Sequence, residues 1–554
     1  MLFNLVFAAA VAACPGASEK TVFWGDLHIH TAYSMDAYVF NNRDDPASAY
    51  RFARGQPRLL PDGSTISIDR PLDFAAVTDH AEYFGVMGIC RGPGRPAYCD
   101  ELDTVSDGRS LKGFSDFFLP FVTKNLPICP VDPEACTDAA VDLWQRTIDA
   151  AESAYEPCEF TTFIANEWTR SPNNLHWHRN LIFASNVVPR RPINVFDEPT
   201  NSDLWHALEV ECGEVEGCDV LAIPHNSNWS LGGASFELGV DDPLRARFEK
   251  LIEIHQHKGN SECFPGSALA DEACGFEIAY PPGLRVRGGN GELTEDERRD
   301  IASGYVRNLL AQGLASFGED GLNPLQLGIM ASTDSHSARP GYVAERGWRG
   351  HMGNFDLSDE RRENSLTLYN PGGLIGVWAE ENTREAIFRA MQRRETFGTS
   401  GPRIRVKLEQ TFDQEVDLCA DSKTSAAPRT LMGGTFEAEA RNPVFFVGSM
   451  KDRAELDLVQ IIKLALVAGS VEQSMVSLSP QPCARWVDTR YDPSVPALYY
   501  VRVLEAPTQR WQGDDKIQER AWTSPIWAVP APTRPPRPDR WQGTKATDLI
   551  SLTH

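Results

Sequence analysis

The sequence predicts an α/β fold, built on parallel strands in an open sheet or a barrel and followed by a β-rich C-terminal region. Short runs of Val, Ile and Phe recur through the first 400 residues, with helical segments between many of them. His, Asp and Glu residues follow several of these runs at the points where strands are expected to end. After Thr399-Ser400-Gly401-Pro402 the helical pattern gives way to alternating apolar stretches.

Each element follows from its local pattern. The predicted strands of the first region are Val22–His30, Phe74–His80, Phe160–Trp168, Asn180–Ala184, Val220–His225, Leu251–His255, Leu327–Ser332 and Leu374–Trp378. The predicted helices are Ala139–Tyr155, Asp203–Glu211, Glu295–Ser316 and Arg384–Arg394. Thr294 and Glu297 have the spacing of a capping box, which places the start of the third helix.

Two long stretches interrupt this pattern, at about residues 84–138 and 258–292, and loops of this length are usually lids or insertions. The expected C-terminal strands are Ile404–Leu408, Phe445–Val447, Leu458–Leu466 and Tyr499–Leu504. We therefore expect a signal segment (1–20), an α/β region (21–400), a β-rich region (401–530) and a surface tail rich in Pro and Arg (531–554).

The composition limits the partners of the chain. The 53 Lys and Arg residues against 77 Asp and Glu residues give a formal charge of −24. A surface this acidic repels polyanions, so we expect no nucleic-acid partner, although a local basic pocket for a small anion remains open. No apolar run reaches the length of about 20 residues that a transmembrane helix needs.

The first residues and the cysteines predict export. Leu2–Ala13 is an apolar run followed by small residues, as in a signal peptide, although no Lys or Arg precedes it. Val11-Ala12-Ala13-Cys14 also fits a lipoprotein signal with a lipid anchor at Cys14, and both interpretations stay open. The protein would then be periplasmic, an outer-envelope lipoprotein or secreted.

Twelve cysteines are unusual for a cytosolic enzyme, and most of them suggest disulfide bonds. The expected pairs are Cys90 with Cys99, Cys129 with Cys136, Cys212 with Cys218, Cys263 with Cys274, and Cys419 with Cys483. Cys158 is left without a partner, and Cys14 falls in the signal segment.

Candidate metal ligands stand where the strands are expected to end, which is where functional groups gather in parallel α/β folds. His28 and His30 alternate along the first strand and so share one face, about 7 Å apart. One such pair arises often by chance, and a lone histidine is more often structural. Many His, Asp and Glu residues at successive strand ends are stronger evidence than any one of them. Burying so many polar groups together would cost free energy unless cations paired them. Imidazole and carboxylate together suit Zn, Mn or Fe.

The motifs resemble the polymerase-and-histidinol-phosphatase (PHP) superfamily and, within it, the family called domain of unknown function 3604 (DUF3604). The matching phrases begin with Gly25-Asp26-Leu27-His28-Ile29-His30-Thr31, Thr78-Asp79-His80, Asn166-Glu167-Trp168-Thr169, His178-Arg179-Asn180-Leu181-Ile182-Phe183 and Ile223-Pro224-His225-Asn226. They continue with Lys258-Gly259-Asn260-Ser261-Glu262, Ser332-Thr333-Asp334-Ser335-His336, Thr396-Phe397-Gly398-Thr399-Ser400-Gly401-Pro402-Arg403 and Trp522-Thr523-Ser524-Pro525-Ile526-Trp527. Together they cover nearly the whole chain after the signal segment.

This resemblance implies a distorted (β/α)7 barrel that holds two or three divalent transition-metal ions. The implied ligands are His28, His30, Glu167 and Asp334 for one ion, Glu167, His178 and His225 for a second, and Asp36, His80 and His336 for a third. Whether His176, His255 or His257 joins them stays open. The superfamily often has His where Asp36 stands, so this chain departs from the pattern at the third site.

A hydroxide that bridges two ions is a nucleophile at neutral pH, which favours hydrolysis. Asp79, Arg179 and Lys258 are the candidate catalytic residues, and for Asp79 a loop-orienting role is an equal alternative. Arg339 and Arg403 are further candidates for binding an anionic substrate. The leading hypothesis is a phosphomonoesterase or phosphodiesterase. The alternatives are an amide, carbamate or ester hydrolase on the same ions, and a non-catalytic metal- or ligand-binding envelope protein.

Overall fold

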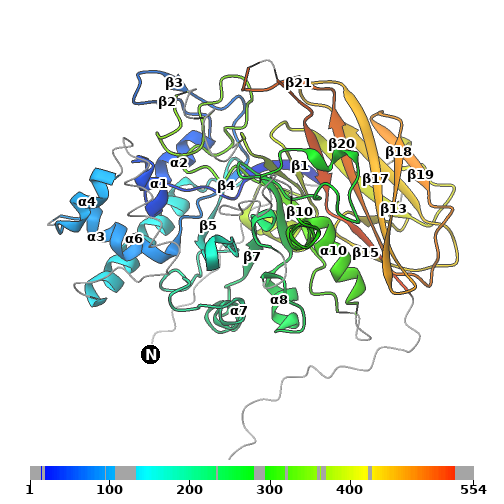
Figure 1. Cartoon of the computed structure of the whole chain (residues 1–554), viewed down its shortest axis with the longest axis horizontal. Helices are drawn as coiled ribbons and strands as arrows, with labels where there is room; N and C mark the ends of the chain where they lie inside the picture. Colours follow the sequence, from blue (N-terminus) through cyan, green and yellow to red (C-terminus); the bar gives the residue numbers. More distant parts are fainter. Residues whose placement is uncertain are drawn as a thin grey trace, which may run out of the picture.

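A computed structural model describes Cys14 and residues 19–93, 95–105, 133–231, 235–279, 293–317, 322–358, 362, 370–421, 427–513 and 515–530. Nearly all of the expected signal segment, parts of both long insertions and the expected surface tail lie outside these residues. The fold is mixed α/β, with a large mixed sheet at its centre (Figure 1).

The large sheet contains strands from both halves of the chain. In spatial order its main path is β15 (Thr435–Glu437), β24 (Ile526–Val529), β20 (Ala497–Glu505), β23 (Arg520–Thr523), β12 (Thr396–Thr399), β11 (Leu374–Ala379), β1 (Thr21–Asp26), β4 (Phe74–Ala76), β5 (Thr161–Trp168), β6 (Arg179–Phe183) and β7 (Val220–Pro224). Strand β17 (Leu456–Val467) pairs with β20 and with β18 (Ser470–Leu478). Residues far apart in the sequence therefore share one hydrogen-bonded sheet.

Smaller sheets surround it. One consists of β10 (Gly328–Ala331), β8 (Leu251–Gln256) and β9 (Gly259–Asn260), and another of β14 (Thr430–Leu431), β13 (Arg405–Thr411), β16 (Val444–Met450) and β19 (Cys483–Val487). Two hairpins pair β2 (Arg58–Leu59) with β3 (Thr65–Ile66) and β21 (Thr508–Gln509) with β22 (Lys516–Ile517). The C-terminal region is β-rich, as the alternating pattern predicts.

The α-helices of the described residues are α1 (Met35–Val39), α2 (Pro46–Ala53), α3 (Phe84–Arg91), α4 (Tyr98–Val105), α6 (Pro133–Ala154), α7 (Asn201–Leu208), α8 (Asp242–Phe248), α9 (Glu295–Ser303), α10 (Val306–Ala315), α12 (Arg384–Gln392) and α13 (Leu418–Asp421). Helices α1, α2, α3, α4 and α6 lie on one side of the molecule and the C-terminal strands on the other (Figure 1). The expected capping box of Thr294 and Glu297 begins α9. The single predicted helix 295–316 is two helices, which meet at Gly304 and Tyr305.

The fold is α/β as expected, but among the described strands the implied distorted (β/α)7 barrel does not close. β1, β4 and β5 are parallel, and so are β8 and β10, but β5, β6 and β7 are antiparallel neighbours. The connection from Trp168 to Arg179 is too short for a helical crossover, so β6 returns antiparallel to β5. β7 lies beside β8 without a hydrogen-bonded ladder, which leaves the curved sheet open there.

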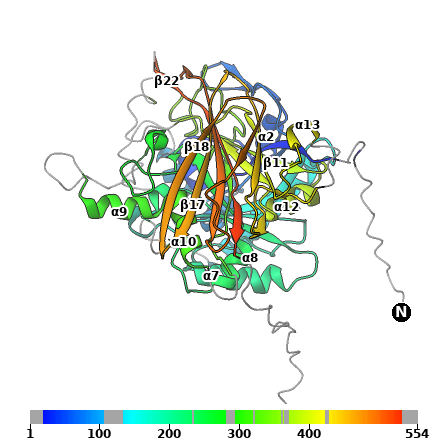
Figure 2. The same ribbon diagram turned by 90° about the vertical axis from the view of Figure 1, so that its right-hand side faces the viewer.

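One apolar core lies between these strands. It contains Leu27, Phe163, Leu251 and Met330, which come from both sides of the open seam, and it is covered by the apolar face of α12. Gly398 allows β12 to approach β10, because a Cβ there would lie 2.9 Å from the carbonyl carbon of Met330. A second core joins α10 to β17 and β18 (Figure 2).

Disulfide bonds join Cys90 to Cys99, Cys212 to Cys218, Cys263 to Cys274, and Cys419 to Cys483, as predicted. Cys129 lies outside the described residues. Cys14 and Cys158 form a further disulfide, which corrects the expectation that Cys158 has no partner. A sulfur in this bond cannot also carry a lipid thioether. In the part of the chain that the structure describes, no helix is both long and apolar enough to cross a membrane.

Candidate metal centre

The ends of β1, β4, β5 and β10 are connected by contacts that continue beyond the regular ladders. The amide of His30 donates to the carbonyl of Ser335 at 2.8 Å, and His80 forms an isolated parallel bridge with Glu167. Asp334 has a φ of 54°, a left-handed conformation that Asp and Asn adopt more readily than other non-glycine residues. Polar side chains from four strand ends, three in the large sheet and one in the β8–β10 sheet, therefore meet at one place.

Four of these side chains form the first ligand group. His28 Nε2 lies 3.3 Å from Glu167 Oε2 and 3.3 Å from Asp334 Oδ1. His30 Nε2 lies 3.3 Å from the same glutamate oxygen and 3.2 Å from the same aspartate oxygen. Atoms bound at 2.0–2.1 Å to one tetrahedral ion lie about 3.3 Å apart, so this spacing fits a shared cation.

Two atoms of this group support the same interpretation. His30 Nε2 and Asp334 Oδ1 are buried, and neither has a hydrogen-bond partner among the residues that the structure describes. Buried polar atoms are normally hydrogen-bonded, and a cation between them accounts for the exception.

Glu167 offers its second oxygen to another pair of histidines. Oε1 lies 2.8 Å from His178 Nδ1 and 3.2 Å from His225 Nε2. Burial lowers the pKa of both imidazoles to about 4. Both rings are therefore neutral at neutral pH, which is the form that binds a metal ion.

Asp36, on α1, centres the third ligand group. Its Oδ2 lies 3.1 Å from His80 Nε2 and 2.9 Å from His336 Nε2. His30 also belongs to this cluster, because its ring stands 4.4 Å from that of His80 and 4.2 Å from that of His336. The three groups are therefore contiguous.

Most of these imidazoles also make a contact through their second ring nitrogen. The contacts are His28 Nδ1 with Glu253 Oε2 (2.9 Å), His30 Nδ1 with Ser34 Oγ (2.9 Å), His80 Nδ1 with Thr169 Oγ1 (2.6 Å), His178 Nε2 with Ser171 Oγ (2.8 Å) and His336 Nδ1 with the carbonyl of Asp334 (2.9 Å). Such contacts fix the orientation of metal-binding histidines.

The buried carboxylates of the cluster need positive charge beside them. Burial alone would raise the pKa of Glu167, but the charge on His80 and the hydrogen bonds from His178 and His225 outweigh it and hold the pKa well below its usual value. Burial would lower the pKa of His28, yet Asp334 and Glu253 raise it well above its usual value. Ionised carboxylates buried together are stable only with cations beside them, and this donor set fits divalent transition metals.

Asp79 lies behind the site instead of inside it. It is fully buried and accepts hydrogen bonds from the backbone and side chain of Thr31, at 2.6 Å each, and from those of Ser34. These contacts position the loop that carries His30, the alternative role that the sequence left open for Asp79.

The structure does not bring Arg179 to the site, which corrects its expected catalytic position. Its guanidinium is buried and contacts Glu249 at 3.0 Å and the carbonyls of Trp177 and Ser235 at 2.9 and 3.0 Å. Arg339 and Arg403 are likewise occupied by backbone carbonyls away from the ligand cluster.

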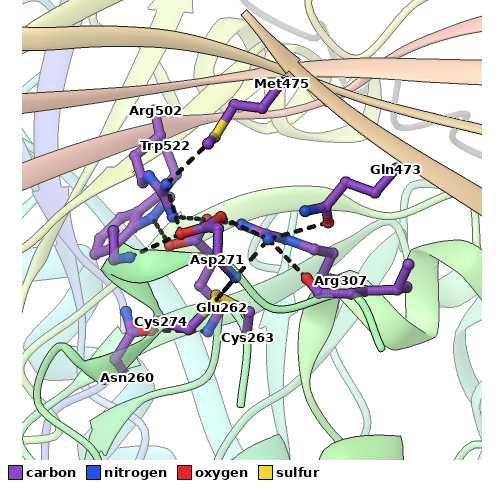
Figure 3. The surroundings of a disulfide bond; sticks show 12 residues. Asn260, Glu262, Cys263, Asp271, Cys274, Arg307, Gln473, Met475, Arg502 and Trp522 are labelled. Atoms are coloured by element: carbon purple, nitrogen blue, oxygen red, sulfur yellow. Dashed lines mark hydrogen bonds and ion pairs between the residues drawn. A yellow bond between two sulfur atoms is a disulfide. The ribbon is translucent and has the colours of Figure 1, made fainter. Parts of the chain in front are cut away.

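Lys258 does reach the site. It lies in the turn between β8 and β9, and its Nζ contacts Asp334 Oδ2. A buried ion network holds the chain just after this turn (Figure 3). Glu262 accepts from Arg307 at 2.6 Å, from Arg502 at 2.9 Å and from Trp522 at 2.7 Å. The network thus connects the insertion that follows β9 to α10 and to the C-terminal strands.

A cavity of about 200 Å³ opens above the ligands. Its floor is formed by ligands from the second and third groups, and Lys258 stands at its side. Much of its wall is apolar, formed by Met35, Phe40, Tyr83, Phe196, Trp229 and Met352. A small molecule with one charged and one apolar end matches this cavity.

The three histidines left open by the sequence differ in position. His257 lies at the edge of the cluster, with Nε2 3.2 Å from Asp334 Oδ2, while His255 packs beside Trp522 instead. His176 lines the cavity and stacks on His178. Sequence reasoning missed Glu253, although a carboxylate inside the apolar run Leu251–Ile254 is itself a signal.

A family model described as protein of unknown function (DUF3604) matches residues 17–481 and 471–530. No curated protein matches. A solved structure from Bacteroides vulgatus, described as a two-domain protein containing a predicted PHP-like metal-dependent phosphoesterase, is 10% identical. The similarity covers 87% of this chain and 90% of that chain, with a TM-score of 0.29, too low to establish a common fold.

Proposed function

This chain belongs to the DUF3604 family, and from the ligand cluster at its strand ends we propose that it is an exported, metal-dependent hydrolase of phosphoesters. The position of Glu167 carries the proposal. One of its oxygens faces His28 and His30, and the other faces His178 and His225. A carboxylate in this position would suit the role of a ligand shared by two ions. Paired divalent ions are common in enzymes that hydrolyse phosphoesters.

In this proposal His28, His30, Glu167 and Asp334 would hold one ion, Glu167, His178 and His225 a second, and Asp36, His80 and His336 a third. When bound, such ions would lower the pKa of water to near neutrality and stabilise negative charge on the reacting phosphoryl group.

The chain's own residues would orient the substrate. The Lys258 ammonium, held against Asp334, would bind a phosphoryl oxygen. The apolar wall that includes Phe196 and Trp229 would bind the organic group of the ester and exclude water. A phosphoester of an aromatic or otherwise apolar alcohol fits a cavity with charged groups at one end and apolar side chains at the other.

The disulfide bonds support the proposed export, because such bonds persist in oxidising compartments. A periplasmic or secreted location is consistent with them.

The proposal is tested by metal analysis of the purified protein, followed by assays with 4-nitrophenyl phosphate, bis(4-nitrophenyl) phosphate and 4-nitrophenyl acetate. We expect bound transition metal and turnover of a phosphoester, with both reduced in His225→Ala. Turnover of the acetate alone would instead favour the amide, carbamate or ester hydrolase. Bound metal without turnover in a broad panel would favour a metal- or ligand-binding protein.

A further inference from the structure

A series of hydrogen bonds connects the backbone N–H of Lys258 to His176, a residue of the cavity wall that lies outside the three ligand groups. The backbone N–H of Lys258 donates to Gln256 Oε1 at 2.6 Å. Gln256 Nε2 donates to Asp334 Oδ2 at 2.8 Å and also to Asn226 Oδ1. Asn226 in turn donates from Nδ2 to His176 Nδ1 at 3.0 Å.

The ends of this series fix the direction of every bond in it. A backbone N–H can only donate and an ionised carboxylate can only accept, so the amide of Gln256 has one orientation. Asn226 must then accept through Oδ1 and donate through Nδ2. An imidazole that accepts at Nδ1 carries its proton on Nε2, so His176 presents a fixed Nε2–H donor.

Packing holds the same ring in place. The ring of His176 stacks on that of His178 at 4.4 Å and 15° and meets Trp229 edge-on at 4.9 Å and 85°. His176 lines the cavity, and among the described residues the bond from Asn226 is its one side-chain hydrogen bond. Its Nε2 makes no hydrogen bond to the described residues, and it is not one of the fully buried atoms that lack a partner. It is therefore accessible to a bound molecule.

We propose that His176 is a catalytic residue that donates from Nε2 to a phosphoryl oxygen of the bound substrate, and that Asn226 and Gln256 are positioning residues for it. The inference rests on the proposed function. His176 keeps its proton throughout, so its role is to stabilise negative charge on oxygen without proton transfer. Asn226 has a φ of 51°, the left-handed conformation that Asn tolerates well, so the backbone can hold its amide in this position.

The test compares His176→Phe, His176→Gln, Asn226→Ala and the double variant His176→Phe/Asn226→Ala in the metal-loaded full chain. The control is His206→Phe, which makes the same change at an exposed histidine of α7. Metal content, the Kd for inorganic phosphate by calorimetry and kcat/KM for 4-nitrophenyl phosphate are measured, and circular dichroism verifies folding.

We expect His176→Phe to keep its metal and to weaken phosphate binding and kcat/KM by about 10- to 100-fold, the range for a hydrogen bond to a charged group. Gln restores most of the loss, because its amide places an N–H near the position of Nε2. Asn226→Ala weakens phosphate binding in the wild-type background but not in the His176→Phe background, because both changes remove one interaction.

Three results overturn the inference: loss of metal in His176→Phe, unchanged phosphate affinity in that variant, or additive effects of the two substitutions. If the wild-type protein binds phosphate but cleaves no phosphoester, the proposed function fails and the affinity measurements still decide the role of His176. If the loaded protein does not bind phosphate, both proposals fail.

Discussion

At the scale of single residues, Glu253 illustrates how much of the centre depends on atoms behind it. Its Oε2 lies 2.9 Å from Nδ1 of His28 and so turns Nε2 of that ring toward Glu167 and Asp334. The carboxylate is fully buried in β8. Removing it leaves His28 without the partner that fixes its orientation.

We therefore expect Glu253→Ala to weaken metal affinity by about 10- to 100-fold, the usual effect of losing such a partner. Competition with a chromophoric chelator measures the change. Glu385→Ala, at an exposed position of α12, serves as the control. An unaltered metal affinity in Glu253→Ala would show that this carboxylate does not support the centre.

Lys258 is the second residue whose role can be measured directly. Its ammonium contacts Asp334 and lines the cavity. We expect Lys258→Met to lower kcat/KM for phosphoesters by about 10- to 100-fold, because a charge-assisted hydrogen bond to the substrate is lost. Lys451→Met, at an exposed site, is the matched control. Equal kinetics for the two variants would contradict the substrate-binding role.

The candidate ligands could be read from the sequence because His28, His80 and Asp334 stand at strand ends in recognisable phrases. The position of Arg179 could not, because its partner Glu249 comes seventy residues later and only folding brings the two together. Glu253 was missed for a similar reason: its contact with His28 is made across the fold.

At the scale of elements, the strand positions followed from local patterns, whereas the pairing of strands did not. The expected strand Phe160–Trp168 is β5 almost residue for residue. The seam between β7 and β8 depends instead on how the sheet curves around its core, which no local run encodes.

The disulfide between Cys14 and Cys158 shows the same limit, because its sequence separation of 144 residues hides the pairing. We expect a peptide pair linked through these cysteines in a non-reducing digest of the natively exported protein, analysed by mass spectrometry. The intact pair Cys212–Cys218 is the internal control. Recovery of Cys14 as a lipidated residue would contradict the structure.

The buried network at Glu262 connects the insertion after β9 to α10 and the C-terminal strands. Burial would raise the pKa of Glu262, but Arg502 and Arg307 outweigh it and lower the pKa from 4.5 to about 2. The ionised carboxylate therefore contributes stability that is fully present above pH 4.5 and is lost as the pH falls toward 2. The shift corresponds to about 3 kcal/mol.

We expect Glu262→Gln to lower the unfolding free energy by about 3 kcal/mol at pH 7, with a smaller difference from the wild-type protein at pH 3. Chemical denaturation at the two pH values measures it. Glu385→Gln, in an exposed helical ion pair, should change stability by less than about 0.5 kcal/mol. A loss that does not depend on pH would argue against an ionised Glu262.

At the scale of the whole molecule, the metal centre lies where strands from distant parts of the sequence meet. β1, β4, β5 and β10 each deliver ligands to it, so bound ions would connect these strands. Without cations the buried carboxylates lack part of the positive charge that compensates them. A metal ion that binds the native state but not the unfolded state would stabilise the native state.

We therefore expect removal of metal by a chelator to lower the Tm, and its return to restore the Tm. In Asp334→Ala, which lacks one oxygen ligand of the first group, the chelator should have a much smaller effect. Differential scanning calorimetry follows both proteins. If the chelator lowers the Tm of the wild-type protein and of the variant equally, the metal that stabilises the protein is not bound at this cluster.

The most direct test of the account is a crystal structure of the metal-loaded protein, with anomalous data collected at the absorption edge of the bound metal. We expect one anomalous peak among His28, His30, Glu167 and Asp334, and another beside Glu167 Oε1, His178 and His225. Peaks confined to other parts of the molecule, with none in contact with Glu167, would contradict it.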